Sequence, residues 1–334
     1  MTLDTAHLVL QMLQESGARP LSGKEIGSKL HISRTAVWKA VRKLKLTGYE
    51  VEAVARQGYR LSGSCGDILS YDGILSYLTP ETSSKLHLEV KSLVSSTHDL
   101  LDEKARVGDP AGTCIVAAQQ ERGRGRRGHS FYSPPGGVYI SLLLRPPALR
   151  INEGRWLTVI AANAACEAID KILMTVPGEH PRAQIKWLND IYLGERKVCG
   201  ILNEARCELE SDLIDYVLCG AGFNLYAPTT SLPSELQNLM GAILPQHAVD
   251  GKNRLTAHFL TAMQNGLAHF EKESCAAAFK ARSNLIGKRV LLEGSHSTCE
   301  ARVLDIDEEC RLQVRFKDGT RAALQGGHVS LISS

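Results

Sequence analysis

Residues 120–128 concentrate four arginines and three glycines in one short segment, Gln-Glu-Arg-Gly-Arg-Gly-Arg-Arg-Gly. Like charges at this density repel one another within a helix or a strand, and glycine weakens both. The segment follows an apolar run, Cys114 to Ala118, so it is predicted to be a surface loop after a strand. Glycines let the backbone approach a ligand, and guanidinium groups bind phosphate or carboxylate oxygens bidentately. We expect an anion-binding loop that becomes ordered around its ligand.

A similar composition also occurs in arginine-glycine segments that bind RNA and in solvated charged turns. RNA-binding segments of that kind usually occur in several copies within disordered sequence. Here a single copy lies between two predicted strands, which favours a small-molecule site.

The composition indicates a folded protein of several domains. At 334 residues the chain is too long for one ordinary core, and 43% hydrophobic with 22% charged residues is typical of folded chains. Nine cysteines without a Cys-x-x-Cys pair indicate reduced thiols in a cytoplasmic protein, not a disulfide framework or a zinc site. The N-terminus lacks a signal-peptide pattern and no run approaches 18 apolar residues, so neither secretion nor a membrane span is expected.

Residues 1–63 are predicted to form a winged helix-turn-helix domain. Ser22-Gly23-Lys24-Glu25 has the pattern of a capping box, in which the serine accepts from a backbone N–H and the glutamate reaches back. After a tight turn, Ser33 caps a second helix, Arg34 to about Leu46, whose apolar residues recur on one face.

A wing of two short strands, 48–54 and 58–61, follows this helix. The exposed face of the helix is basic, and no acid interrupts residues 34–45. Cations bind DNA phosphates, while side chains near the start of a recognition helix reach base edges. We therefore expect DNA binding by Arg34, Thr35, Trp38, Lys39, Arg42 and, in the wing turn, Arg56. The alternative is a small helical domain with a solvated basic face, but cap, turn, apolar stripe and wing agree on a helix-turn-helix.

A linker-like run at 62–64, Ser-Gly-Ser, precedes a region in which strand-like and helix-like segments alternate. This alternation predicts a mixed α/β domain over 66–284. Its clearest helices are Arg155 to Leu173 and Leu255 to His269. Its expected strands lie at 86–94, 114–118, 137–144, 184–187 and 213–219.

Three further clusters in this region carry groups suited to ligand binding. Ser95-Ser96-Thr97-His98-Asp99 follows a strand, where it equally suits a helix N-cap. Lys186 to Asp190 begins a hairpin-like unit, in which Lys197 enters an apolar strand and is either pointed inward or a surface lysine. Gly220 to Asn224 ends a strand with small residues, which permit the close approach of a ligand or simply tight packing.

Taken together, fixed cations, a lysine, a carboxylate and a glycine-rich backbone suit phosphoryl or nucleotidyl transfer. The sequence contains no Walker loop, no dinucleotide-binding glycine pattern between a strand and a helix, and no serine nucleophile elbow. The residues alone therefore indicate a site for a nucleotide phosphate and a small acid.

Over essentially its whole length, the sequence resembles the bifunctional biotin protein ligase/biotin operon repressor family. Gly123 to Gly128 is identical to the family's G-R-G-R-R-G loop. Lys186 to Asp190, Arg196 to Leu202 and Gly220 to Asn224 support the match. The winged helix is what distinguishes the repressor branch from members that are ligases only.

The resemblance implies a biotin site, a nucleotide site and catalytic groups. Biotin would be held by Ser96, Thr97, His98, Gln120, Arg124, Gly125, Arg126 and Lys197. The nucleotide would be held by Arg126, Arg127, Phe131, Asn189 and Asn224. Arg126, Lys197 and Asp190 would be catalytic, and Asp190 would also face Mg²⁺ and the incoming lysine. A second loop, residues 225–236, would order over the adenylate.

The sequence departs from the family pattern at three positions. His98 replaces the asparagine of Ser-Thr-Asn, Leu188 replaces the proline of Lys-Trp-Pro-Asn-Asp, and Phe131 stands where an indole is common. The change at residue 188 removes no functional group, and Phe131 is expected to keep an aromatic face for stacking on adenine. Contacts of the family's asparagine do not transfer directly to His98.

Residues 285–334 contain five short strand-like runs separated by turns such as Glu293-Gly294 and Asp318-Gly319. This spacing predicts a small β-barrel. By resemblance it is an SH3-like domain that covers one side of the site, and a purely structural role is the alternative. The expected fold is thus multidomain α+β, with domains 1–63, 66–284 and 285–334.

The resemblance implies ATP-dependent formation of biotinyl-AMP and transfer of biotin to a lysine of the biotin carboxyl carrier protein of acetyl-CoA carboxylase. It also implies repression at operator DNA, with biotinyl-AMP as corepressor and a homodimer when adenylate is bound. A biotin-sensing repressor without ligase activity is one alternative, which the arginine loop, Lys197 and Asp190 oppose. A lipoate-type acyl ligase is the other, which the loop and the winged helix disfavour.

Overall fold

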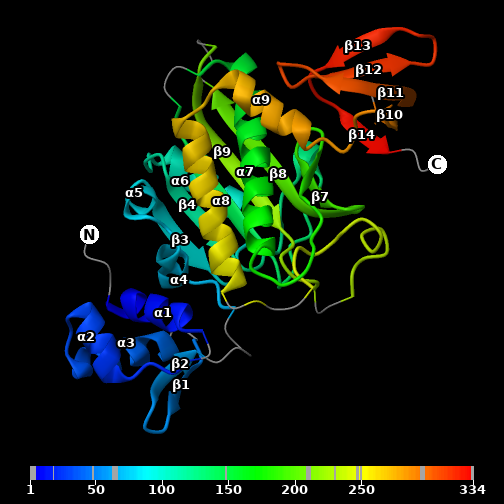
Figure 1. The fold of residues 1–334 in the computed structure, drawn as a ribbon. Coiled ribbons are helices and arrows are strands. Elements are labelled where there is room, and N and C mark those ends of the chain that lie inside the picture. The colour runs from blue at the N-terminus through cyan, green and yellow to red at the C-terminus, as the bar shows by residue number, and fades with distance from the viewer. Residues whose placement is uncertain are drawn as a thin grey trace.

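The chain forms three bodies, which a computed structural model describes over residues 5–17, 19–46, 49–61, 67–146, 149–207, 212–228, 231–245, 248, 250–293 and 298–331. Figure 1 shows an N-terminal helical body, a large central α/β body and a small C-terminal sheet. The predicted linker at 62–64 lies outside the described residues.

The N-terminal body has the predicted helix-turn-helix and wing. Its elements are α1 (Thr5–Glu15), α2 (Gly23–Leu30), α3 (Arg34–Leu46), β1 (Val51–Val54) and β2 (Gly58–Leu61). Ser22 Oγ accepts from the N–H of Glu25, and Ser33 Oγ from that of Ala36, both at 3.1 Å, so both predicted caps are confirmed. The Glu25 carboxylate does not complete the predicted capping box, because it pairs with Arg19 at 2.9 Å instead.

The central body is built on a seven-stranded mixed sheet in the order β3-β4-β5-β9-β8-β7-β6. Its strands are β3 (His87–Lys91), β4 (Thr113–Ala117), β5 (Val138–Leu144), β6 (Gln184–Lys186), β7 (Asp190–Leu193), β8 (Arg196–Cys207) and β9 (Ile214–Phe223). β3 and β4 are parallel and are connected through α6 (Thr97–Arg106), while the other neighbours are antiparallel. The predicted mixed α/β architecture is confirmed.

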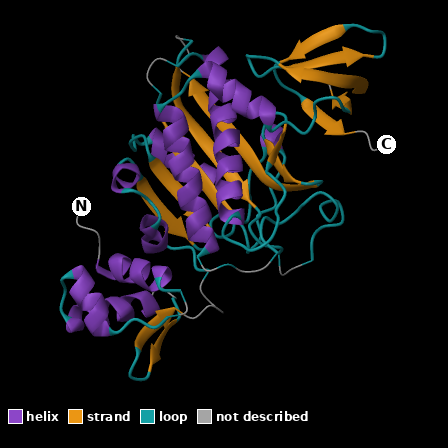
Figure 2. Cartoon of the chain, viewed as in Figure 1, coloured by secondary structure: helices purple, strands orange, loops and turns teal. Residues whose placement is uncertain are grey.

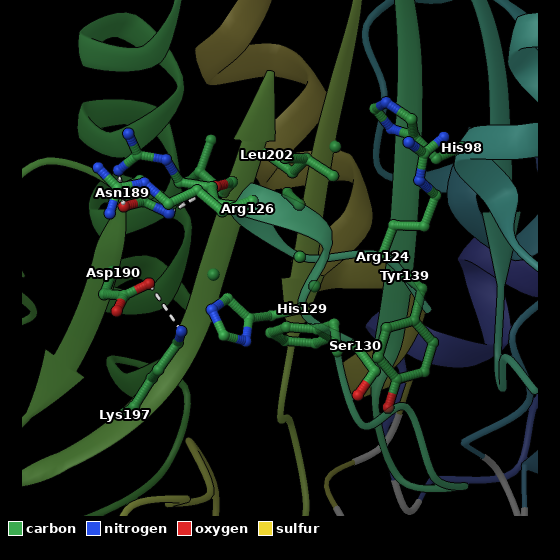
Figure 3. A pocket seen from close by; sticks show the side chains of 18 of the residues that line it. His98, Arg124, Arg126, His129, Ser130, Tyr139, Asn189, Asp190, Lys197 and Leu202 are labelled. Atoms are coloured by element: carbon green, nitrogen blue, oxygen red, sulfur yellow. Dashed lines mark hydrogen bonds and ion pairs between the residues drawn. The ribbon is translucent and has the colours of Figure 1, made fainter. Parts of the chain in front are cut away.

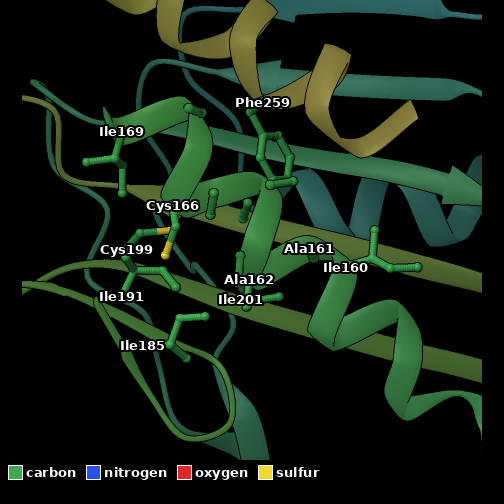
Figure 4. Packing of buried hydrophobic residues seen from close by; sticks show 14 of the residues in the cluster. Ile160, Ala161, Ala162, Cys166, Ile169, Ile185, Ile191, Cys199, Ile201 and Phe259 are labelled. Carbon is green, nitrogen blue, oxygen red and sulfur yellow. The ribbon is translucent and has the colours of Figure 1, made fainter. Parts of the chain in front are cut away.

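Two long helices, α7 (Arg155–Leu173) and α8 (Gly251–Ala268), cover one face of this sheet (Figure 2). Small side chains let α7 lie close to it: Ala162 and Cys166 are buried, and Figure 4 shows them beside Ile201 and Cys199 of β8. The shorter helices of the body are α4 (Tyr71–Ser76), α5 (Pro80–Ser84) and α9 (Lys272–Ala281). This face of the sheet is covered by the large apolar core.

The opposite face of the sheet is only partly covered. Because side chains alternate along a strand, Cys219 of β9 belongs to the large core, whereas Leu218 packs in a separate cluster with Leu101 of α6. Helix α6 thus covers part of this face, and its N-terminus lies at the edge of a cavity described below.

A buried polar junction joins the N-terminal body to α8. Asn253 Nδ2 donates to Tyr49 Oη at 3.2 Å, and Tyr49 Oη lies 2.5 Å from Ser70 Oγ. Asp250, 1% exposed, accepts from Asn253 at 3.2 Å and from Tyr77 at 3.3 Å. Burial raises the pKa of Asp250 to about 7, so this junction contains a carboxyl group that titrates near neutral pH.

The C-terminal body is a five-stranded antiparallel sheet in the order β13-β12-β11-β10-β14. Its strands are β10 (Arg289–Glu293), β11 (Thr298–Ile306), β12 (Leu312–Phe316), β13 (Arg321–Leu324) and β14 (His328–Leu331). The five predicted strands are present, but within the described part of the chain β13 and β14 do not pair, so the sheet is open and a closed barrel is not confirmed. The predicted turn residue Gly294 lies outside the described residues.

Candidate active site

A cavity of about 330 Å³ opens beside the N-terminus of α6, a volume typical of small-molecule sites. Its walls come from α6, the arginine loop, strands β5, β9 and β8, the segment before β7, and the C-terminal sheet. The predicted site residues in its lining are Thr97, His98, Gln120, Arg124, Gly125, Arg126, Arg127, Phe131, Asn189, Asp190 and Lys197 (Figure 3). Ser96 and Asn224 are not part of the lining.

One end of the cavity is built around Thr97 and Gln120. Thr97 donates to Gln120 Oε1 through its backbone N–H at 2.8 Å and its hydroxyl at 3.0 Å, and Gln120 Nε2 donates to Ser133 Oγ at 2.9 Å. Ser141 Oγ of β5, which no sequence pattern singled out, lies 2.8 Å from Thr97 Oγ1. Ser96 caps α6, which is the alternative that its sequence context left open. The network fixes the Gln120 amide and offers hydrogen-bonding groups to a small polar ring.

The arginine loop folds back onto the sheet. Arg126 Nη1 donates to Asn189 Oδ1 at 2.9 Å, and burial, reinforced by the charge of Arg127, lowers the pKa of Arg126. A side chain at Gly123 would lie 2.4 Å from the Phe131 carbonyl oxygen, so this position requires glycine. The loop therefore places the Arg126 guanidinium in the cavity lining, where the Asn189 amide holds it.

Arg124 spans two carboxylates at the same end as Thr97. Its guanidinium lies 2.9 Å from Asp99 Oδ1 and 3.0 Å from Glu204 Oε1. Glu204 was not among the site residues predicted from the sequence. A signal was available, because Gly200, Leu202 and Glu204 occupy alternate positions of one strand and so share a face.

Lys197 and Asp190 meet across neighbouring strands, with Nζ and Oδ1 2.7 Å apart (Figure 3). Lys197 lines the cavity, so the inward orientation predicted for it is confirmed. Asn224 supports it from outside the lining, since Asn224 Nδ2 donates to the Lys197 carbonyl at 3.3 Å. Burial also lowers the pKa of Lys186, which lines the same end.

Asp190, the residue expected to face Mg²⁺, is one of the carboxylates that line this cavity. Across the described residues, no cluster of three or more His, Cys, Asp or Glu side chains has a metal-binding arrangement. Mg²⁺ in nucleotide sites is usually held by one or two carboxylates together with phosphate oxygens and water. A single aspartate beside the cations Lys197 and Arg126 fits that mode of binding.

Phe131 occupies space that two glycines provide. A Cβ on Gly222 would lie 2.5 Å from its ring, and one on Gly200 would lie 2.8 Å from it. The ring packs edge-on against Tyr139, with centroids 6.4 Å apart, and Lys197 Nζ lies 5.8 Å from its centroid. The small residues at the end of β9 thus permit a close approach, and here the approaching group is a side chain of this protein.

The second predicted loop, 225–236, is anchored at its start, and the chain that follows it is anchored at Lys197. Leu225 and Tyr226 are buried, while residues 229–230 lie outside the described residues. Where the chain returns, the Lys197 N–H donates to the Leu239 carbonyl, and the Lys197 carbonyl accepts from the Gly241 N–H, both at 2.8 Å. The chain three to five residues beyond this loop is therefore tied to the strand position of Lys197.

The C-terminal sheet, which the resemblance places at one side of the site, contributes Glu293, Gly327 and Val329 to the cavity lining, and none of these three residues was predicted individually. Trp187, in the segment before β7, donates from Nε1 to the Cys310 carbonyl at 2.8 Å and so fastens this sheet to the site. No local pattern marks these residues, because the contact arises from the docking of two bodies.

The predicted DNA-binding face of α3 is exposed. Its exposed residues are Arg34, Thr35, Trp38, Lys39 and Arg42. The Arg42 guanidinium lies 5.6 Å from the centroid of the Trp38 ring, and Arg56 is exposed at the wing turn. The N-terminal body therefore presents a basic helix with one aromatic side chain among its cations.

Known proteins match both parts of this arrangement. Residues 90–224 match the biotin/lipoate A/B protein ligase family, and residues 5–60 match a helix-turn-helix domain. The bifunctional ligase/repressor BirA of Bacillus spizizenii is 35% identical over 232 residues, which are 69% of this chain and 68% of that protein. The chain belongs to the bifunctional biotin ligase/repressor family. Its central body is a biotin ligase, and its N-terminal body is the helix-turn-helix of the repressor branch.

The similarity extends beyond the matched domains. The bifunctional ligase/repressor BirA of Escherichia coli is 27% identical over 322 residues, covering 94% of this chain and 93% of that protein. The biotin protein ligase from Aquifex aeolicus, solved in complex with biotin and ATP, shares the fold over 74% of this chain and 99% of its own, with a TM-score of 0.59 at 23% identity. None of the helices in the described residues has the length and apolar character of a membrane span.

Proposed function

We propose that this protein is an ATP-dependent, AMP-forming ligase that makes biotinyl-5′-AMP and transfers biotin to a lysine of the biotin carboxyl carrier protein of acetyl-CoA carboxylase. It also represses biotin synthesis genes. One observation carries the ligase proposal: the Thr97–Gln120 network, the arginine loop and the Lys197–Asp190 pair line one cavity. A polar ring, a carboxylate and a phosphate each find a matching group there.

The residues divide along the cavity according to the part of the adenylate that they suit. The biotin end comprises Thr97, His98, Gln120, Arg124 and Gly125, with Ser96 acting as the cap of α6. The nucleotide end comprises Arg126, Arg127, Phe131 and Asn189, with Asn224 acting through Lys197. Lys197 and Arg126 serve the junction between biotin carboxylate and α-phosphate.

In the first step, a carboxylate oxygen of biotin attacks the α-phosphorus of ATP, the bond to pyrophosphate breaks, and a mixed anhydride forms. The Lys197 ammonium and the Arg126 guanidinium stabilise the negative charge that develops on the phosphoryl oxygens. In the second step, the amine of the acceptor lysine attacks the acyl carbon and AMP leaves. Asp190 accepts the proton that the lysine loses. Mg²⁺ bound with the nucleotide would be held by Asp190 and would neutralise phosphate charge.

The repressor activity depends on α3 and the wing. Lys39, Arg42 and Arg56 contact phosphates, while Arg34, Thr35 and Trp38 reach base edges. Biotinyl-AMP acts as corepressor by ordering the arginine loop and residues 225–236, which favours a homodimer that matches a two-fold operator. The three domains are 1–63, 66–284 and 285–334, and the last is an SH3-like domain that covers one side of the site.

A transfer assay tests the ligase proposal. The protein is incubated with MgATP, a carrier domain, and either labelled biotin or labelled lipoate. We expect label on the carrier lysine from biotin alone, together with biotin-dependent exchange of pyrophosphate into ATP. Lipoate transfer would indicate an acyl ligase of different specificity, and biotin binding without transfer would indicate a sensor; either result contradicts the proposal.

A further inference from the structure

Three buried polar atoms beside the cavity have no hydrogen-bond partner within the described residues: His98 Nδ1, His98 Nε2 and Glu204 Oε2. The whole His98 residue is 3% exposed. Burying a polar atom without a partner is unfavourable, so groups of this kind in a ligand site are expected to gain a partner in another state. The proposed function places His98 at the biotin end but assigns no contact to its two ring nitrogens or to Glu204.

One carboxylate lies between the arginine loop and this imidazole. Glu204 Oε1 accepts from Arg124 Nη2 at 3.0 Å, while Glu204 Oε2 lies 3.4 Å from His98 Nε2. The second distance is within reach of an ion pair but is not a hydrogen bond. Figure 3 shows His98 and Arg124 together at one end of the cavity. Glu204 therefore links the histidine to the first arginine of the G-R-G-R-R-G loop.

The carboxylate selects one tautomer of the neutral ring. If Nε2 were unprotonated, its lone pair would face a carboxylate oxygen of Glu204 and be repelled by it. The proton of the neutral ring therefore resides on Nε2 and points at Glu204. The ring is packed over β9, where a Cβ added to Gly220 would lie 3.2 Å from Nδ1. A shift of Glu204 by about half an ångström would complete a hydrogen bond from Nε2.

We propose that His98 is a positioning residue that acts through Glu204: its imidazole orients the carboxylate that holds Arg124 and so sets the arginine loop against biotin. The inference rests on the proposed function, because it concerns the biotin end of that site. It gives a role to the position at which this chain departs from the family's asparagine. An asparagine side chain reaches the position of Nδ1 but is too short to reach that of Nε2.

The same geometry makes loop positioning sensitive to pH. The charged groups around the ring are Glu204 and Arg206 of β8, Arg124 of the loop, and Asp99 and Asp102 of α6. Burial, opposed by the Glu204 charge, lowers the pKa of His98, so the ring is neutral at pH 7. Below that pKa the imidazolium competes with Arg124 for Glu204 and repels the guanidinium. Affinity for biotin is therefore expected to fall as the solution is acidified through the pKa of His98.

Two amide substitutions distinguish the ring nitrogens in the full-length protein. His98→Gln places an amide near the position of Nε2, and His98→Asn places one near that of Nδ1. Biotin binding is measured by calorimetry, and biotin-dependent pyrophosphate exchange is measured between pH 5.5 and 8. We expect His98→Asn to raise the KM for biotin about tenfold with kcat changed less than about threefold. His98→Gln should recover most of the wild-type affinity for biotin. Its affinity for biotin should not fall as the pH is lowered. His87→Gln, the same change at an exposed histidine of β3, is the control and should keep the wild-type pH profile.

The combination with Glu204→Gln tests the linkage without relying on the histidine variants alone. If His98 acts through Glu204, the double variant Glu204→Gln with His98→Asn should be no worse than the poorer single variant. Additive effects would overturn the inference, as would His98→Asn outperforming His98→Gln, or a loss of affinity in His98→Gln at the same acidic pH at which the wild type loses it. A wild-type protein that binds no biotin would instead contradict the proposed function, so the two failures are distinguishable.

Discussion

Two basic segments of this protein, α3 and the arginine loop, present their charges in different ways. In α3, Arg34 and Lys39 are exposed on a regular helix, and the ion pairs formed by the described residues do not engage them. In the arginine loop, two carboxylates hold Arg124 and the Asn189 amide holds Arg126. Backbone hydrogen bonds shape both segments, but in the loop the cationic side chains Arg124 and Arg126 are themselves held by other side chains.

This difference corresponds to two kinds of ligand. The DNA backbone is an extended polyanion, which mobile cations neutralise without strict placement. A mixed anhydride has one location for each charge, and a guanidinium displaced by about an ångström loses much of its stabilising effect. Removing an anchored cation should therefore cause a large and local loss, while removing an exposed cation should cause a small, salt-dependent one.

The largest effect is expected for the anchored cation Arg126. Arg126→Ala should weaken retention of the adenylate by about a hundredfold, because a charge-assisted contact to the phosphate is lost in a partly buried site. Released adenylate should then label lysines of bystander proteins, which mass spectrometry would detect. Arg122→Ala, a change at an exposed arginine outside the cavity lining, is the control. Unchanged acceptor selectivity in Arg126→Ala would contradict the role assigned to that arginine.

An intermediate effect, on the free energy of unfolding, is expected at the buried polar junction of Tyr49, Asn253 and Asp250. This junction joins the N-terminal body to the central body. The folded-state pKa of Asp250, about 7, lies above its unfolded value near 4, so its contribution to stability is complete below pH 4 and is lost as the pH rises through 7. Asp250→Asn removes this titration. The variant should exceed the wild type in free energy of unfolding by about 2 kcal/mol at pH 8, with the difference closing toward pH 4.

Urea denaturation at pH 5, 6, 7 and 8 would measure this difference. Asp215→Asn, a change at an exposed carboxylate of β9, serves as the control and should keep the wild-type dependence on pH. A constant difference between Asp250→Asn and wild type across these pH values would show that Asp250 does not titrate in this range.

The smallest effect is expected for an exposed cation. Lys39→Ala should weaken binding to the chain's own promoter region about threefold to tenfold and reduce the slope of log affinity against log salt by about 1. Mobility-shift assays at several salt concentrations would measure both quantities, with Lys85→Ala, just after α5, as the control. A loss of ligase activity in Lys39→Ala would contradict the assignment of α3 to DNA binding and of the arginine loop to adenylate binding.

Local sequence signals sufficed for much of the fold. The caps at Ser22 and Ser33, the limits of α3 and the turn before β8 follow from residue types a few positions apart, and the structure confirms them. The arginine loop was also evident locally, because its charge and glycine content exclude regular structure. Sequence by itself thus determined many elements of this protein, the family to which it belongs and eleven of the residues that line the cavity.

The tertiary structure decided which of these groups meet. It assigned Ser96 to a helix cap and Thr97 to the cavity, and it left the C-terminal sheet open. It also brought Glu204 between Arg124 and His98. These contacts depend on the order and register of β5, β9, β8 and β7. Because these strands bring together positions far apart in the chain, no local sequence pattern predicts the contacts. The arginine loop was visible in the sequence, but the carboxylates and the amide that hold it became known only from the folded sheet.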